Sequence, residues 1–155
     1  MKTLIIYHTK TGHTLEAINP FAEALKEEGV EVQIVLAKNF KPDMLKGCDS
    51  LFIGAPCWTG VAGGDGIPGP INRAIDRIPN NALEGILCGG LAIYSIGGGD
   101  VTIAQLKNRV TEKGCANFKS GPVIRAGVPL SLFKGKSVSK VDEELVRKFA
   151  KEFIS

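Results

Sequence analysis

The fold is decided by the segment Thr9-Lys10-Thr11-Gly12-His13-Thr14, which follows the apolar run Leu4-Ile5-Ile6-Tyr7 directly and precedes a stretch with helical spacing. This order predicts a strand, a turn and then a helix. Such a turn presents unpaired backbone N–H groups and the positive end of a helix dipole, which suits a terminal phosphate monoester. The spacing matches neither G-x-G-x-x-G nor G-x-x-x-x-G-K-[ST], so a mononucleotide is the expected ligand. The alternative is that Thr11 or Thr14 serves only as a helix N-cap.

A second apolar strand, expected near residues 50–53, ends in the loop Gly54-Ala55-Pro56-Cys57-Trp58-Thr59-Gly60. Loops at the carboxyl ends of parallel strands form the ligand-binding edge of open α/β sheets. Two interpretations are therefore open for Trp58, the only tryptophan of the chain. Trp58 either lies flat against a planar ring of the ligand or forms ordinary half-buried packing.

A third apolar strand, expected at 91–94, leads into the loop Ser95-Ile96-Gly97-Gly98-Gly99-Asp100 before another helix. Three consecutive glycines remove side chains from the backbone, so a flat ligand can approach it closely. A flexible turn without a ligand is the alternative.

The whole chain alternates between strand and helix patterns, which predicts an α/β protein with a parallel sheet and helices on both faces. Further strands are expected at 31–36 and 122–126. Helices are expected from about 14 to 28, where Pro20 should bend or interrupt the helix, at about 71–78, and after a cap at Asp100. The last helix begins at an N-cap on Ser139 and carries an apolar stripe, consisting of Val141, Leu145, Phe149 and Phe153. We expect residues 1–155 to form a single domain.

Composition excludes several functions. The 155 residues are 44% hydrophobic and 23% charged, with a net charge of +3, which is typical of a soluble protein without a nucleic-acid or membrane partner. No apolar run is long enough for a signal peptide or a membrane span, so the cytoplasm is the expected location. The four cysteines form no C-x-x-C pair, so no metal site is expected. No catalytic residue is assigned, because neither histidine has a paired nucleophile or carboxylate nearby in sequence.

The three loops in this order resemble those of the flavodoxin family, and the resemblance spans nearly the whole chain. It implies a doubly wound sheet of five parallel strands in the order 2-1-3-4-5. It also implies FMN as cofactor. The residues that match the family's FMN-phosphate loop are Thr9, Lys10, Thr11, Gly12, His13 and Thr14. The residues that match its second loop, which lies against the isoalloxazine ring, are Pro56, Cys57, Trp58, Thr59 and Gly60. The residues that match its third loop are Ser95, Ile96, Gly97, Gly98, Gly99 and Asp100.

The resemblance implies an electron carrier that passes single electrons at low potential between redox partner proteins, as a monomer or weak homodimer. Three departures from the family bear on this function. The third loop has no aromatic residue between Ser95 and Asp100, the chain is basic where flavodoxins are usually acidic, and Val61–Pro70 is a long Gly/Pro insert. The first and third departures favour an alternative, an FMN-dependent NAD(P)H or quinone reductase, whereas the short chain favours the carrier. A binding module that has lost its cofactor is a third possibility, against which the intact first loop argues.

Overall fold

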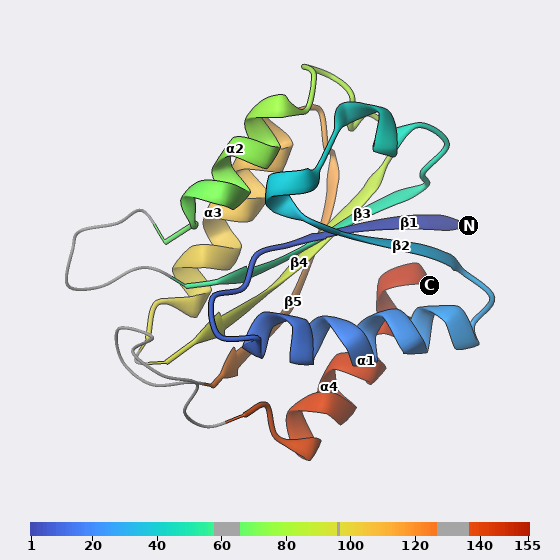
Figure 1. Cartoon of the computed structure of the whole chain (residues 1–155). Helices are drawn as coiled ribbons and strands as arrows, with labels where there is room; N and C mark the ends of the chain where they lie inside the picture. The colour runs from blue at the N-terminus through green and yellow to red at the C-terminus, as the bar shows by residue number, and fades with distance from the viewer. Residues whose placement is uncertain (58–65, 96, 127–136) are drawn as a thin grey trace.

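The computed structural model describes residues 1–57, 66–95, 97–126 and 137–155. These residues form a five-stranded parallel sheet in the order β2-β1-β3-β4-β5, as the sequence predicts (Figure 1). The strands are β1 (Lys2–Tyr7), β2 (Glu31–Leu36), β3 (Ser50–Pro56), β4 (Leu87–Tyr94) and β5 (Asn117–Arg125). Helices α1 (His13–Glu27) and α4 (Lys140–Ile154) cover one face, and α2 (Gly69–Arg77) and α3 (Gly99–Thr111) cover the other. The chain between β2 and β3 forms two short 3-10 helices, Ala37–Asn39 and Pro42–Leu45, in place of an α-helix.

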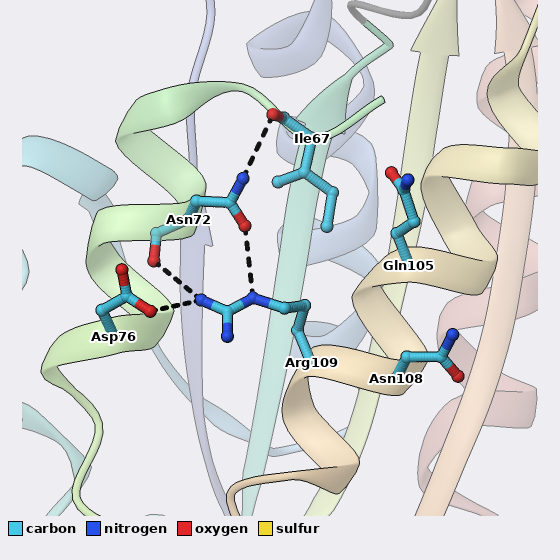
Figure 2. A pocket seen from close by; sticks show the side chains of 6 residues that line it. All are labelled: Ile67, Asn72, Asp76, Gln105, Asn108 and Arg109. Atoms are coloured by element: carbon cyan, nitrogen blue, oxygen red, sulfur yellow. Dashed lines mark hydrogen bonds and ion pairs between the residues drawn. The ribbon is translucent and has the colours of Figure 1, made fainter. Parts of the chain in front are cut away.

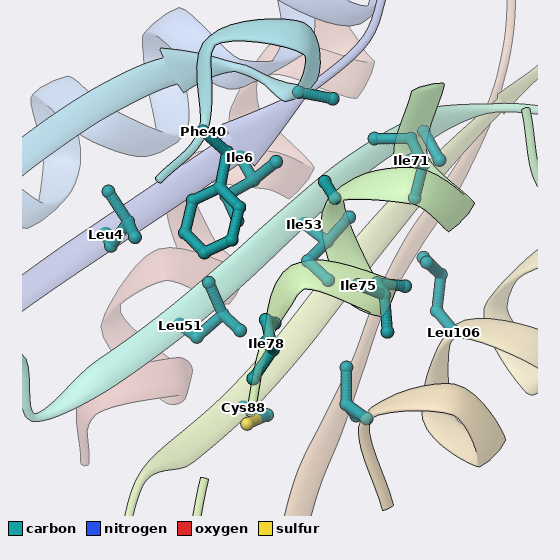
Figure 3. Close-up of a cluster of buried hydrophobic side chains, with 14 of the residues drawn as sticks. Leu4, Ile6, Phe40, Leu51, Ile53, Ile71, Ile75, Ile78, Cys88 and Leu106 are labelled. Carbon is teal, nitrogen blue, oxygen red and sulfur yellow. The ribbon is translucent and has the colours of Figure 1, made fainter. Parts of the chain in front are cut away.

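Each face of the sheet has its own hydrophobic cluster. On one face, Leu4, Ile6, Leu51 and Ile53 of β1 and β3 pack against the isoleucines of α2 (Figure 3). On the other, an aromatic cluster joins the sheet to α1 and α4. Its members are Phe21, Phe52, Phe149 and Phe153, and the rings of Phe21 and Phe52 stack with centroids 3.9 Å apart. The two clusters hold the helices in the positions that aim their N-termini at the carboxyl edge of the sheet.

β4 begins at Leu87, four residues before its predicted start, because two glycines hide the strand pattern. A Cβ on Gly89 would lie 2.9 Å from the carbonyl oxygen of Lys119, and one on Gly90 would lie 2.9 Å from that of Ile53. The neighbouring strands therefore approach too closely for any side chain at these positions.

Three helix predictions need correction. α1 runs through Pro20, so the interruption that was one of the two predicted outcomes is wrong, since the tertiary packing of its apolar face outweighs the lost backbone hydrogen bond. The N-cap of α3 is Gly98, so Asp100 lies in the first turn, where its carboxylate still faces the positive end of the helix.

In α4, Ser139 is the N-cap, as predicted, and its hydroxyl accepts a hydrogen bond from the backbone of Asp142 at 3.1 Å. The predicted apolar stripe is wrong in its first half, because Val141 is 75% exposed and Leu145 48% exposed. Positions four residues apart drift by about 40° per step around a helix, so the stripe leaves the buried face. The buried side chains are those of Val146, Ala150 and Phe153.

Candidate functional site

The loops that follow β1, β3 and β4 are joined to one another at the carboxyl edge of the sheet. The backbone N–H of His8, after β1, donates to the carbonyl of Gly54 in β3 at 3.2 Å. The backbone N–H of Cys57, after β3, donates to the carbonyl of Ile93 in β4 at 2.6 Å, and its thiol donates to the carbonyl of Gly97 at 3.3 Å. The described parts of the three sequence-predicted segments therefore lie side by side.

The first loop closes on itself and starts α1. The hydroxyl oxygen of Thr9 accepts a hydrogen bond from the backbone N–H of Gly12 at 2.9 Å. Gly12 is the N-cap of α1 in the left-handed conformation, with φ of 93°, and makes no side-chain cap. Neither Thr11 nor Thr14 therefore acts as the N-cap, and backbone N–H groups of the first turn of α1 stand where an anion could accept from them.

The side chains of this loop divide into exposed and buried groups. Lys10 is exposed, whereas His13 and Thr14 are only 4% and 1% exposed. The Nδ1 atom of His13 lies 3.5 Å from a carboxylate oxygen of Glu16, and the ring is buried from solvent. Thr14 turns its methyl group toward Gly54 of β3, which lacks a side chain at the point of contact.

The second loop is described only at its beginning. Pro56 ends β3 and Cys57 follows it, half-buried. Trp58, Thr59 and Gly60 lie outside the described residues, as does Ile96 of the third loop. The contact of Trp58 with a planar ring stays a prediction.

The third loop is anchored near both of its ends. The carbonyl of Ser95 accepts from Arg125 Nε at 3.3 Å, and the carbonyl of Gly98 accepts from the backbone N–H of Thr102 at 3.1 Å. Gly99 is buried, whereas Asp100 is exposed. The loop therefore presents glycine backbone at the edge that it shares with the first two loops.

Sequence reasoning missed two cations at this edge. Arg125 ends β5 beside the third loop, and its position at the end of a predicted strand was the available signal. Arg73 of α2 lies close enough to His8, which directly follows β1, for its charge to affect the pKa of His8, and nothing in the sequence indicated this proximity. Burial lowers the pKa of His8 from its ordinary value of 6.5, and the positive charge of Arg73 lowers it further.

The lowered pKa of His8 predicts how the stability of the protein depends on pH. The unfolded chain takes up a proton at His8 near pH 6.5, whereas the folded chain does so only at lower pH. The unfolded state thus binds more protons in this interval, and the free energy of unfolding should decrease as the pH falls below 6.5. His8→Gln should remove this part of the slope, which for one proton is at most about 1.4 kcal/mol per pH unit. Urea denaturation at several pH values measures it, and equal slopes for both proteins would contradict the assignment.

A cavity of about 450 Å³ lies between α2 and α3, and its lining contains none of the predicted site residues (Figure 2). Arg109 of α3 crosses the cleft. Its guanidinium donates to the side-chain and backbone oxygens of Asn72, both at 3.3 Å, and pairs with Asp76 of α2. These contacts clamp the two helices together, so we read Arg109 as a structural residue.

Two searches of the described residues bear on other functions. Within residues 1–57, 66–95, 97–126 and 137–155, no group of three or more His, Cys, Asp or Glu side chains is placed to hold a metal ion. No helix in the same part of the chain combines the length and apolar character that crossing a membrane requires.

Strand order, helix placement and the three joined loops together define a flavodoxin-like fold. Solved structures of that fold are similar over the whole chain. Flavodoxin 2 from Bacillus cereus matches with a TM-score of 0.78 and 20% identity, covering 99% of this chain and 98% of that one. Two-electron reduced flavodoxin from Megasphaera elsdenii matches with a TM-score of 0.66 and 21% identity, covering 96% and 98%.

The same fold also occurs within a larger protein. Rubredoxin oxygen:oxidoreductase from Desulfovibrio gigas matches with a TM-score of 0.71 and 17% identity, covering 97% of this chain but 34% of that one. No protein-family model and no curated protein matches the sequence. The similarity in structure therefore confirms the fold that the three loops predicted.

Proposed function

We propose that the chain binds FMN as one domain and carries single electrons between redox partner proteins. The observation that carries this proposal is the joining of the three loops at the carboxyl edge, the first of which ends at the glycine-capped N-terminus of α1. The two flavodoxins named above are described in oxidised and two-electron reduced forms, respectively, which agrees with a redox role. Their lengths are nearly matched by this chain.

The residues present fit a phosphate monoester. In the proposed site the phosphate of FMN accepts hydrogen bonds from the backbone N–H groups of Thr11, His13 and Thr14, and the positive end of α1 faces it. The bond from Gly12 to Thr9 sets the shape of the turn before any ligand arrives. Lys10 is exposed on the same loop and adds a positive charge.

In the proposed site the flavin ring would lie between the second and third loops. Pro56–Gly60 would contact it from one side, with Trp58 stacked on the ring, and Ser95–Asp100 from another, with glycine backbone. Bound FMN supplies the one-electron chemistry. A site that keeps water from the ring, beside a phosphate dianion, disfavours added negative charge and so lowers the reduction potential.

Stepwise reduction of the FMN-loaded protein tests the proposal. A single-electron carrier should show, at intermediate points of a dithionite titration, an absorption band that neither the oxidised nor the fully reduced protein shows. NADH or NADPH should leave the oxidised spectrum unchanged. A spectrum that converts directly to the fully reduced form with NAD(P)H, followed by turnover of a quinone, would overturn the carrier and support the reductase.

A further inference from the structure

The third loop contains three consecutive glycines, which makes its conformation costly to fix. Glycine loses more conformational freedom on folding than any other residue, so each of the three needs a specific restraint. Gly98 has one, because it is the left-handed N-cap of α3 and its carbonyl accepts from Thr102. Gly99 has another, because it is the first residue of α3 and is buried beside Val123.

Gly97 lacks both kinds of restraint. It is exposed, and among the described residues nothing lies within 4 Å of the point where its side chain would begin. What the structure does provide is the hydrogen bond of 3.3 Å from the thiol of Cys57 to the Gly97 carbonyl. The restraint on the first glycine of this loop therefore comes from the second loop.

The other three cysteines show that this bond is unlike an ordinary local thiol contact. The thiols of Cys48, Cys88 and Cys115 donate to carbonyls four, two and two residues away in sequence. All three are buried, and these three carbonyl bonds stay within one local segment, although the Cys88 and Cys115 thiols also interact with each other. Cys57 is the half-buried cysteine, and its thiol reaches a carbonyl 40 residues away.

Cys57 is itself held in place, so its thiol can position another group. Its backbone N–H bonds to the carbonyl of Ile93 at 2.6 Å and extends the pairing of β3 with β4 by one residue. One residue thus holds the carbonyl of Ile93 in β4 and the carbonyl of Gly97 in the loop that follows. Because the peptide unit is planar and trans, fixing the Gly97 carbonyl also fixes the N–H of Gly98, which points away from Cys57.

We propose that Cys57 is a positioning residue whose thiol couples the second cofactor loop to the third and orients the Gly97–Gly98 peptide for the flavin. The coupling of the loops stands on the structure alone, whereas the effect on the flavin rests on the proposed function. This role differs from the direct ring contact that the sequence predicts for Cys57. The thiol's bond runs to the protein backbone.

The coupling is tested first on the cofactor-free protein by ¹⁵N backbone relaxation. Cys57→Ala removes the donor and should lower the order parameters of residues 97–99. Cys57→Ser keeps a donor and should stay closer to the wild-type values. Cys48→Ala removes a thiol-to-carbonyl bond of similar length, 3.2 Å, away from the site and should leave the loop unchanged. Unchanged order parameters in Cys57→Ala would overturn the proposal.

The second measurement is FMN affinity by titration of the same variants. Cys57→Ala should weaken binding roughly three- to tenfold, which corresponds to the loss of one modest hydrogen bond, and Cys57→Ser should restore most of it. A loosened loop with wild-type affinity would contradict the positioning role. Failure of the wild-type protein to bind FMN would instead overturn the proposed function, and the relaxation data would still decide whether Cys57 couples the loops.

Discussion

The cofactor-free protein is expected to bind FMN more than about a hundredfold more tightly than riboflavin, because the two ligands differ only in the phosphate. Each hydrogen bond to a charged group contributes about 1.5–3 kcal/mol, and a factor of ten in affinity corresponds to about 1.4 kcal/mol. Two such bonds from the turn at Thr11–Thr14 are enough for the expected ratio. Titration followed by flavin fluorescence measures both affinities.

Two glycines at opposite ends of α1 provide a matched pair of variants for this preference. Gly12 and Gly29 both have positive φ, 93° and 81°, and a Cβ at either would meet nothing within 4 Å. Alanine should therefore strain both backbones by a similar amount, roughly 1–2 kcal/mol. Gly12→Ala should reduce the preference for FMN, whereas Gly29→Ala should keep it. Equal affinity of the wild-type protein for both flavins would show that the loop does not bind phosphate.

Phe52→Ala is expected to lower the free energy of unfolding by about 3–5 kcal/mol, a large share of the stability of a domain this size. Phe52 is fully buried in β3, and its ring stacks on Phe21 of α1 and meets the edge of Phe153 of α4. Removing it leaves a cavity between the sheet and both helices. Urea denaturation of the cofactor-free protein measures the loss.

Phe149 supplies the control for this prediction, because it belongs to the same aromatic cluster but is only partly buried. Phe149→Ala should cost clearly less than Phe52→Ala, since less apolar surface is lost and solvent can fill the space. Equal losses for the two variants would mean that the ring at position 52 is not the centre of this cluster.

The fold could be predicted because its signals are local and repeated. Short apolar runs separated by helical spacing indicate a parallel sheet, and buried strands read as continuous hydrophobic runs. The order of the strands followed from the resemblance of the three loops to a known family, and the structure confirms it. Placing those loops at one edge needed only the rule that parallel strands share their carboxyl ends.

What could not be predicted depends on tertiary contact. The buried face of α4 is chosen by the helix and sheet beneath it, so Val141 and Leu145 were misplaced although the helix was found. Gly89 and Gly90 interrupt the apolar pattern of β4 because the backbone of the neighbouring strands leaves no room for a side chain at either position. The bond from Cys57 to Gly97 joins residues 40 apart in sequence, and no spacing rule connects them.

The two hydrophobic clusters have a consequence for how the protein would acquire the proposed FMN. The described residues of the first and third loops, 8–12 and 95–98, belong to neither cluster. If the proposed function is right, FMN would therefore add no residue to either cluster of the described part of the chain, and the protein would be expected to fold first and bind FMN afterwards. The fraction of protein with FMN bound would then depend on the concentration of free FMN. Because FMN would bind the folded state and not the unfolded one, a higher concentration would also raise the melting temperature.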